Sequence, residues 1–179
     1  MEIDGKRTIR IMLVLLAGLF FLTGFAVAET FRFDPQEISM KPGETTTVDL
    51  VLSDAPGGLS GYRTTVMIET SGVAEITSVT FPTWAEFTGA EGAPGVKVKV
   101  TGVDLNGQVE KNSRDIVLAT LTISGISEGN GILGFEDAFF DDDRDNRIIH
   151  DTVNCTVLVS TSPAVTATVS ASTTTTAST

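Results

Sequence analysis

The densest group of potential metal ligands is an acidic run at residues 141–151. Asp141, Asp143 and Asp145 stand at alternate positions, as the first three ligands of a calcium-binding loop do. Position twelve of that pattern is Thr152, where a bidentate carboxylate is expected. A solvated acidic hairpin tip is the first interpretation of this run, a calcium site at the three aspartates is the alternative, and no other cofactor is expected.

Residues suited to covalent or acid–base catalysis are sparse. His150 is the only histidine, and neither a serine elbow nor a metal-type histidine pair accompanies it. The acidic residues fall mainly in turns and on polar strand faces, where solvation explains them. The sequence therefore predicts that the protein is not an enzyme.

The segment Asn154-Cys155-Thr156 is an N-glycosylation sequon. Alternation places Asn154 on the outer face of a strand and Cys155 among the buried residues. Because Cys155 is the only cysteine, the domain has no internal disulfide and must be held by an apolar core. Asn154 is a candidate glycosylation site.

Aromatic residues that bind polysaccharide are scarce. The chain has one Trp and one Tyr, too few for a planar strip of sugar-stacking rings. Trp84 follows a proline between two phenylalanines, and we expect it to pack over an edge of the domain.

The elements that must position these residues are β-strands, because apolar residues recur with period two and no segment has a helical period. Several short strands within roughly 130 residues predict an all-β fold, a two-sheet β-sandwich with jelly-roll topology. The sets that share one strand face are Val48, Leu50 and Leu52; Tyr62, Thr64, Val66 and Ile68; Val96, Val98 and Val100; Val117, Ala119, Leu121 and Ile123; and Val153, Cys155, Val157 and Val159. In the strand from Val117 to Ile123, Ile116 and Leu118 make the other face apolar too.

Turn signals separate these runs. Glycine and asparagine supply the positive φ of tight turns, and proline ends strands. The predicted turns are 41–43, 55–58, 70–72, 92–95, 106–107 and 128–131.

The first 28 residues have the layout of a secretory signal peptide. Basic residues precede an apolar run from Ile11 to Phe25, and Ala26 and Ala28 are suited to cleavage. The mature chain would begin at Glu29 and be extracellular, secreted or bound to the cell surface. An uncleaved membrane anchor is the alternative, and it is the only membrane contact expected.

Two domain-scale features complete the organisation. Residues 29–160 form the predicted domain, and residues 161–179 form a Thr/Ser-rich low-complexity stalk or tail. With Lys plus Arg at 12 and Asp plus Glu at 23, the formal net charge is −11. This charge excludes nucleic acid and anionic lipid as expected partners.

The order and spacing of several segments resemble a cohesin module over nearly the whole of residues 31–160. Met40–Leu50 is similar to the family's opening, a Pro-Gly-Glu-Thr turn before a valine-rich strand. Gly57–Tyr62 with Val73–Val79 resembles the next hairpin, and Asp115–Ile123 resembles the late core strand. Ile132–Phe135, the acidic run and the strand to Val157 resemble the ending.

This resemblance implies a nine-stranded jelly roll that binds a protein partner, a dockerin-like one in the best-known members, through one sheet face. Gly61 and Arg63 replace the family's Asn and Asp contacts to dockerin, and Ile68-Glu69-Thr70-Ser71 replaces a Tyr-Asp-Pro. The acidic domain and its tail resemble the cohesin-like modules of archaeal cell-surface proteins. A carbohydrate-binding module and a structural cell-surface component remain the alternatives.

Overall fold

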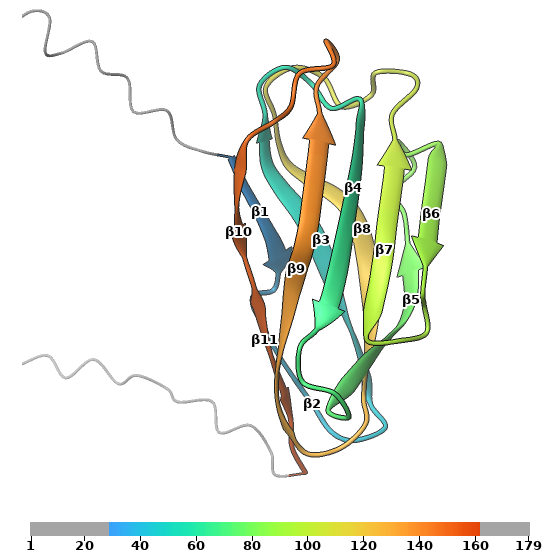
Figure 1. Ribbon diagram of the computed structural model, residues 1–179, viewed down its shortest axis with the longest axis vertical. Helices are drawn as coiled ribbons and strands as arrows, with labels where there is room; N and C mark the ends of the chain where they lie inside the picture. Colours follow the sequence, from blue (N-terminus) through green and yellow to red (C-terminus); the bar gives the residue numbers. More distant parts are fainter. Residues whose placement is uncertain (1–28, 162–179) are drawn as a thin grey trace, which may run out of the picture.

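The computed structural model describes residues 29–161, whose strands form two facing sheets (Figure 1). The described residues contain eleven strands and no helix, so the all-β sandwich prediction is confirmed. The predicted signal peptide, residues 1–28, and all but the first residue of the predicted tail lie outside the described part. Within that part, no helix is long and apolar enough to span a membrane.

Each sheet mixes strands that are distant in sequence. The five-stranded sheet has the order β10 (His150–Val153), β1 (Glu29–Asp34), β3 (Thr45–Ala55), β8 (Ser113–Gly125) and β5 (Ala74–Thr80). The six-stranded sheet has the order β2 (Glu37–Met40), β11 (Cys155–Val159), β9 (Gly129–Asp141), β4 (Gly61–Ile68), β7 (Lys97–Val103) and β6 (Phe87–Glu91).

The first and last stretches of the sandwich each cross between the sheets. β1 lies in the five-stranded sheet, and β2, two residues later, joins the six-stranded sheet beside β11. β10 and β11 make the same change across Asn154. Counting each broken strand once gives 11 − 2 = 9 strands, the number that the cohesin resemblance implies.

The core lies between the sheets and follows the predicted alternation. The inward residues of β3, β4 and β7 are buried as predicted, except Val96, which stands before β7 and is exposed. Phenylalanines from β1 and β9 add a group of rings the alternation did not predict. The buried or partly buried members of that group are Phe31, Phe33, Phe135 and Phe140.

The set predicted to share one face of β8 was wrong at one end. Ala119, Leu121 and Ile123 face the core, but the other buried residues are Ile116 and Leu118 rather than Val117. The register of β3 against β8 shifts between Leu50 and Val51. A bulge changes which side chains face inward, so simple alternation fails on passing through it.

One predicted turn is displaced along the chain. A turn was predicted at 128–131, but the observed turn lies between Gly125, where β8 ends, and Gly129, where β9 begins. Gly129 and Gly131 already pair with Val159 and Val157 of β11. A β-carbon on Gly129 would lie 2.9 Å from Val73 Cγ2, so glycine here allows the first residue of β9 to lie close to Val73.

Cys155 is expected to be an inert thiol in the folded domain. Its side chain is buried, and desolvation, followed by the charge of Glu37, raises the pKa of the thiol to about 11. At pH 8, we expect a disulfide thiol reagent to label native protein far more slowly than denaturant-unfolded protein, which should give one thiol per chain. Rapid stoichiometric labelling of native protein would contradict this environment.

The same shift predicts a loss of stability at alkaline pH. The unfolded thiol ionises near pH 9, whereas the folded thiol resists ionisation until about pH 11. The contribution of Cys155 is therefore complete below pH 9 and is lost as the pH rises through that interval. A Cys155→Ala variant provides the matched control for this pH dependence.

Candidate functional site

Where β3, β5 and β8 pair between Thr45 and Asp49, the outer face of the five-stranded sheet carries polar side chains. Thr120 donates a hydrogen bond to Asp49 Oδ1 at 2.6 Å across β3 and β8. The neighbouring outward positions on β3, β5 and β8 are Thr45, Thr47, Glu75, Ser78, Thr80, Thr122 and Ser124. This surface offers no aromatic anchor for a partner among those residues.

The outer face of the six-stranded sheet carries exposed apolar side chains instead. Phe87 on β6 is 65% exposed, and Val103, its neighbour on β7, is 36% exposed. Gly61 on β4 continues the same row and leaves Val103 uncovered on that side. Exposed aromatic and aliphatic side chains on one face are typical of a binding surface.

Two arginines lie against the Phe139 ring in the next row of this face. The Arg63 guanidinium of β4 lies 4.8 Å from the centre of the Phe139 ring, and that of Arg147 lies 4.7 Å from it. Arg63 is directly opposite Phe139 in the register of β4 and β9. We call these three residues the Phe139 cluster.

An apolar hollow adjoins this cluster because β9 loses its neighbour halfway along. β11 pairs with β9 only from Gly129 to Leu133, since the chain then crosses to the other sheet as β10. Beyond that point a hollow of about 230 Å³ opens, which we call the β9–β10 notch. Its lining consists of Ala138, Phe139, Arg147, Ile148, Ile149 and His150.

Ion pairs lie on this face where β7 begins and β6 ends. Lys97 Nζ lies 2.5 Å from Glu136 Oε2, and Lys99 Nζ lies 3.5 Å from Glu91 Oε2. All four side chains are substantially exposed, so each pair contributes little to stability. Lys97 and Lys99 thus each have a carboxylate partner.

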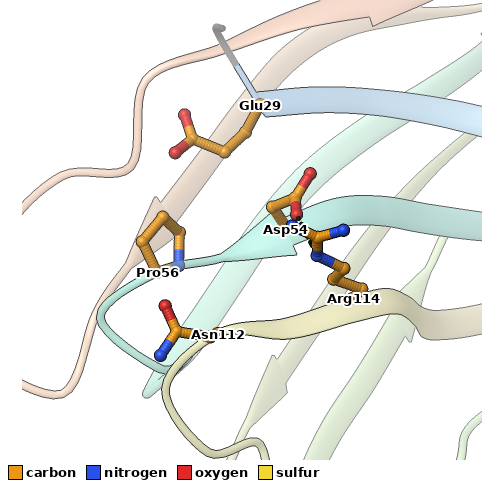
Figure 2. A pocket seen from close by; sticks show the side chains of 5 residues that line it. All are labelled: Glu29, Asp54, Pro56, Asn112 and Arg114. Atoms are coloured by element: carbon orange, nitrogen blue, oxygen red, sulfur yellow. Dashed lines mark ion pairs between the residues drawn. The ribbon is translucent and has the colours of Figure 1, made fainter. Parts of the chain in front are cut away.

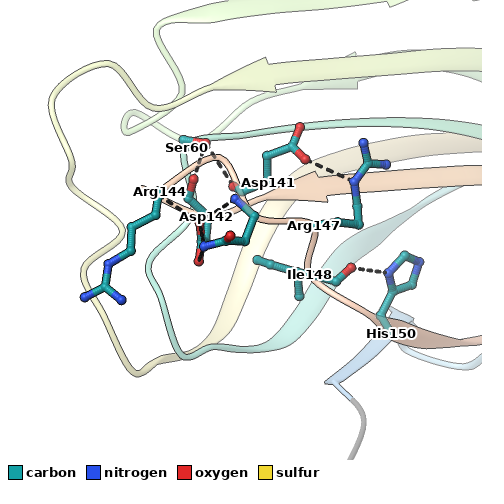
Figure 3. Close-up of polar contacts among 8 residues, drawn as sticks. Ser60, Asp141, Asp142, Arg144, Arg147, Ile148 and His150 are labelled. Atoms are coloured by element: carbon teal, nitrogen blue, oxygen red, sulfur yellow. Dashed lines mark hydrogen bonds and ion pairs between the residues drawn. The ribbon is translucent and has the colours of Figure 1, made fainter.

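The three aspartates of the predicted calcium loop take separate positions. Asp141 Oδ1 accepts a hydrogen bond from Arg147 Nε at 3.0 Å, as Figure 3 shows. Asp143 lies close to Gly58 of the preceding loop, and Asp145 has a positive φ of 60°. Among the described residues, no group of three His, Cys, Asp or Glu side chains is arranged to hold a metal ion.

Asp142, which the calcium pattern did not include, organises the loop. Its Oδ1 accepts hydrogen bonds from the backbone N–H of Arg144 at 2.8 Å and of Asn146 at 2.9 Å. These bonds, those from Asn146 foremost, lower the pKa of the Asp142 carboxyl. Ser60 Oγ donates to the carbonyl oxygens of Asp141 and Asp142, which ties the loop to the start of β4 (Figure 3).

The calcium site stays a prediction. It requires a rise in Tm when calcium is added to chelated protein, because a ligand that binds only the folded state stabilises it. An unchanged Tm would leave the solvated acidic tip as the description of the loop.

Asn154 lies at the crossing between β10 and β11, where it is exposed. Cys155 beside it is buried, as the alternation predicted. Glycosylation of Asn154 stays a prediction, and the mass of natively produced protein compared with that of an Asn154→Gln variant tests it.

A second hollow, of about 370 Å³, lies at one end of the sandwich (Figure 2). It is lined by Glu29, Asp54, Pro56, Asn112 and Arg114. Arg114 Nε lies 3.2 Å from Asp54 Oδ1, so the only cation of the lining is already paired with a carboxylate. This lining lacks the nucleophile with an adjacent base that covalent catalysis requires.

The side chains of Trp84 and His150 both pack against aromatic residues of the core. Trp84 Nε1 donates to the Val117 carbonyl oxygen at 3.1 Å, and its ring packs against the core near Tyr62, as predicted. His150 stands edge-on to Phe140, with ring centres 4.7 Å apart. The only tryptophan is thus engaged with the domain rather than presented as a flat surface for sugars.

Comparison with known proteins identifies the fold. No protein-family model matches the chain, and no curated protein sequence matches it. The chain is similar in structure to the sixth cohesin of Acetivibrio cellulolyticus scaffoldin B, solved with a dockerin, at 18% identity and a TM-score of 0.63. That match covers 75% of this chain and 100% of the cohesin.

Two further matches come from different settings. A non-cellulosomal cohesin from the archaeon Archaeoglobus fulgidus is 16% identical, with a TM-score of 0.60 over 75% of this chain and 92% of that one. A cohesin module from a Clostridium perfringens family 33 glycoside hydrolase is 15% identical, with a TM-score of 0.58 over 74% and 95%. The chain therefore has a cohesin-like fold, a jelly-roll sandwich of two β-sheets.

Proposed function

We propose that this protein is an exported, non-catalytic binding module that recognises a protein partner through the outer face of its six-stranded sheet. The observation that carries the proposal is the contrast between the two outer faces. The five-stranded sheet carries threonine, serine and acidic residues over β5 and the paired parts of β3 and β8, whereas the six-stranded sheet presents Phe87, Val103 and the Phe139 cluster. Aromatic residues and arginine are the types enriched in protein interfaces.

The structural relatives support a protein partner. The scaffoldin B cohesin was solved in complex with a dockerin. A dockerin-like protein is therefore the first partner class to test, although the archaeal relative is described as non-cellulosomal. Export is proposed from the sequence of residues 1–28, and the intact mass of the exported protein tests cleavage before Glu29.

The test is affinity capture from the producing organism's extracellular fraction, with and without calcium, followed by reconstitution with the purified partner. A Phe87→Glu/Val103→Glu variant is expected to lose binding at least tenfold, because each substitution places a charge in the apolar part of the face. A Thr47→Glu/Thr122→Glu variant adds the same charges to the other outer face and should bind within twofold of the unsubstituted protein.

Two results would contradict the proposal. Equal binding by both variants would remove the six-stranded face from recognition. Recovery of polysaccharide alone would move the function to carbohydrate binding, and recovery of neither would favour a structural cell-surface role.

A further inference from the structure

The Phe139 cluster holds two arginines on an acidic domain, and Arg63 is the one of them without a carboxylate partner among the described residues. Residues 29–161 contain nine Lys or Arg and 21 Asp or Glu, which gives 9 − 21 = −12. The side chain of Arg63 makes no ion pair or hydrogen bond with any described residue, and its guanidinium lies 4.8 Å from the centre of the Phe139 ring. An arginine in this state has all its donors free for a ligand.

Both guanidinium groups are already positioned. Arg147 is held by its Nε hydrogen bond to Asp141 and by the Phe139 ring, and Arg63 is held by its contact with the same ring. Stacking on a ring restricts a flexible side chain, so less entropy is lost when the remaining N–H groups bind. A planar guanidinium pairs best with a carboxylate, through two parallel hydrogen bonds.

The notch beside the cluster is apolar. Ile149 is 70% exposed at its rim, and Ala138, Phe139 and Ile148 form much of its lining. At about 230 Å³ it has room for one aliphatic side chain. Phe139 and Arg147 therefore belong both to the lining of the apolar notch and to the Phe139 cluster.

We propose that this combined site binds a segment of the protein partner in which an Asp or Glu stands within two residues of an aliphatic side chain. The carboxylate accepts hydrogen bonds from the free N–H groups of Arg63, and the aliphatic group enters the β9–β10 notch beside Arg147. The proposal rests on the protein-binding function above and specifies the chemistry of what is bound.

The experiment pans a phage-displayed library of random peptides against the immobilised full-length exported chain. The selected peptides are then synthesised and their affinities measured. We expect enrichment of acidic residues next to Leu, Ile, Val or Met, and binding at least tenfold weaker to an Arg63→Glu/Arg147→Glu variant. An Arg114→Glu/Arg144→Glu variant makes the same charge change outside the site and should bind within twofold.

Charge reversal supplies a second readout. Panning against Arg63→Glu/Arg147→Glu should select peptides with Lys or Arg in place of Asp or Glu. Equal Tm values for the two double variants establish that both are folded.

Three outcomes would overturn the proposal. The first is that the selected peptides show no enrichment of acidic residues, and the second is that the Arg63→Glu/Arg147→Glu variant selects the same peptides. The third is that polygalacturonate in a native gel slows the migration of the protein in a way that depends on Arg63, which would assign the site to acidic polysaccharide. None of them decides the proposed function, because capture of the native partner by the Phe87 and Val103 face is measured separately.

Discussion

Replacing Phe31 with alanine is expected to lower the free energy of unfolding by about 3–5 kcal/mol. The Phe31 side chain is fully buried where β1 meets β9 and β10. Its ring centre lies 4.1 Å from that of Phe135 and 4.9 Å from that of Phe140. The substitution removes the transfer free energy of one ring and leaves its aromatic neighbours facing a cavity.

Urea unfolding followed by the fluorescence of the single tryptophan measures this effect. The expected loss is a large share of the roughly 5–15 kcal/mol that stabilises a typical domain. Phe87→Ala removes the same side chain from an exposed position and should change the free energy of unfolding by no more than about 0.5 kcal/mol. Similar values for the two variants would contradict the central place of Phe31 in the core.

The sandwich is predictable from sequence because a half-buried strand imposes period two. Val48, Leu50 and Leu52 are buried as predicted, and so are Val98 and Val100. Alternation fails at Val117 because the register of β3 against β8 shifts there, and this shift depends on the pairing of two strands that are distant in sequence. Pairing between distant strands leaves no local trace in either sequence.

The candidate site is less predictable for the same reason. Arg63 and Phe139 meet only because β4 and β9 pair in one particular register. One local signal was present: adjacent residues of a strand face opposite sides, so Phe139 and Phe140 cannot both be buried in one core. The structure turns Phe140 inward and Phe139 toward the two arginines.

The acidic run shows a second limit of spacing arguments. The alternate aspartates match a calcium loop, yet Asp141 pairs with Arg147, and Asp142, outside the pattern, accepts the turn's N–H groups. A carboxylate can bind a cation, a guanidinium or a backbone N–H, and only the folded loop selects among them. Residue types therefore predicted an acidic hairpin tip but not the hydrogen-bond partners within it.

Gly102→Ala is the second substitution expected to be strongly destabilising, by about 1–3 kcal/mol or more. Gly102 pairs with Tyr62 across β7 and β4, and a β-carbon on Gly102 would lie 2.4 Å from Cε1 of the Tyr62 ring. The ring has little freedom to move, because its hydroxyl donates a 2.6 Å hydrogen bond to the Leu118 carbonyl oxygen. Burial raises the pKa of Tyr62 above its ordinary value, so the hydroxyl remains a donor.

A double-mutant cycle with Tyr62→Ala separates this clash from any backbone effect of alanine. Once the ring is removed, Gly102→Ala should cost less than about 0.5 kcal/mol, because alanine is otherwise favoured over glycine within a strand. Gly89→Ala is the matched control on the adjacent strand, since its β-carbon would meet only the Thr101 hydroxyl, which can rotate away. If Gly102→Ala were equally costly with and without the ring, the close approach of Tyr62 would not be the reason that β7 has glycine here.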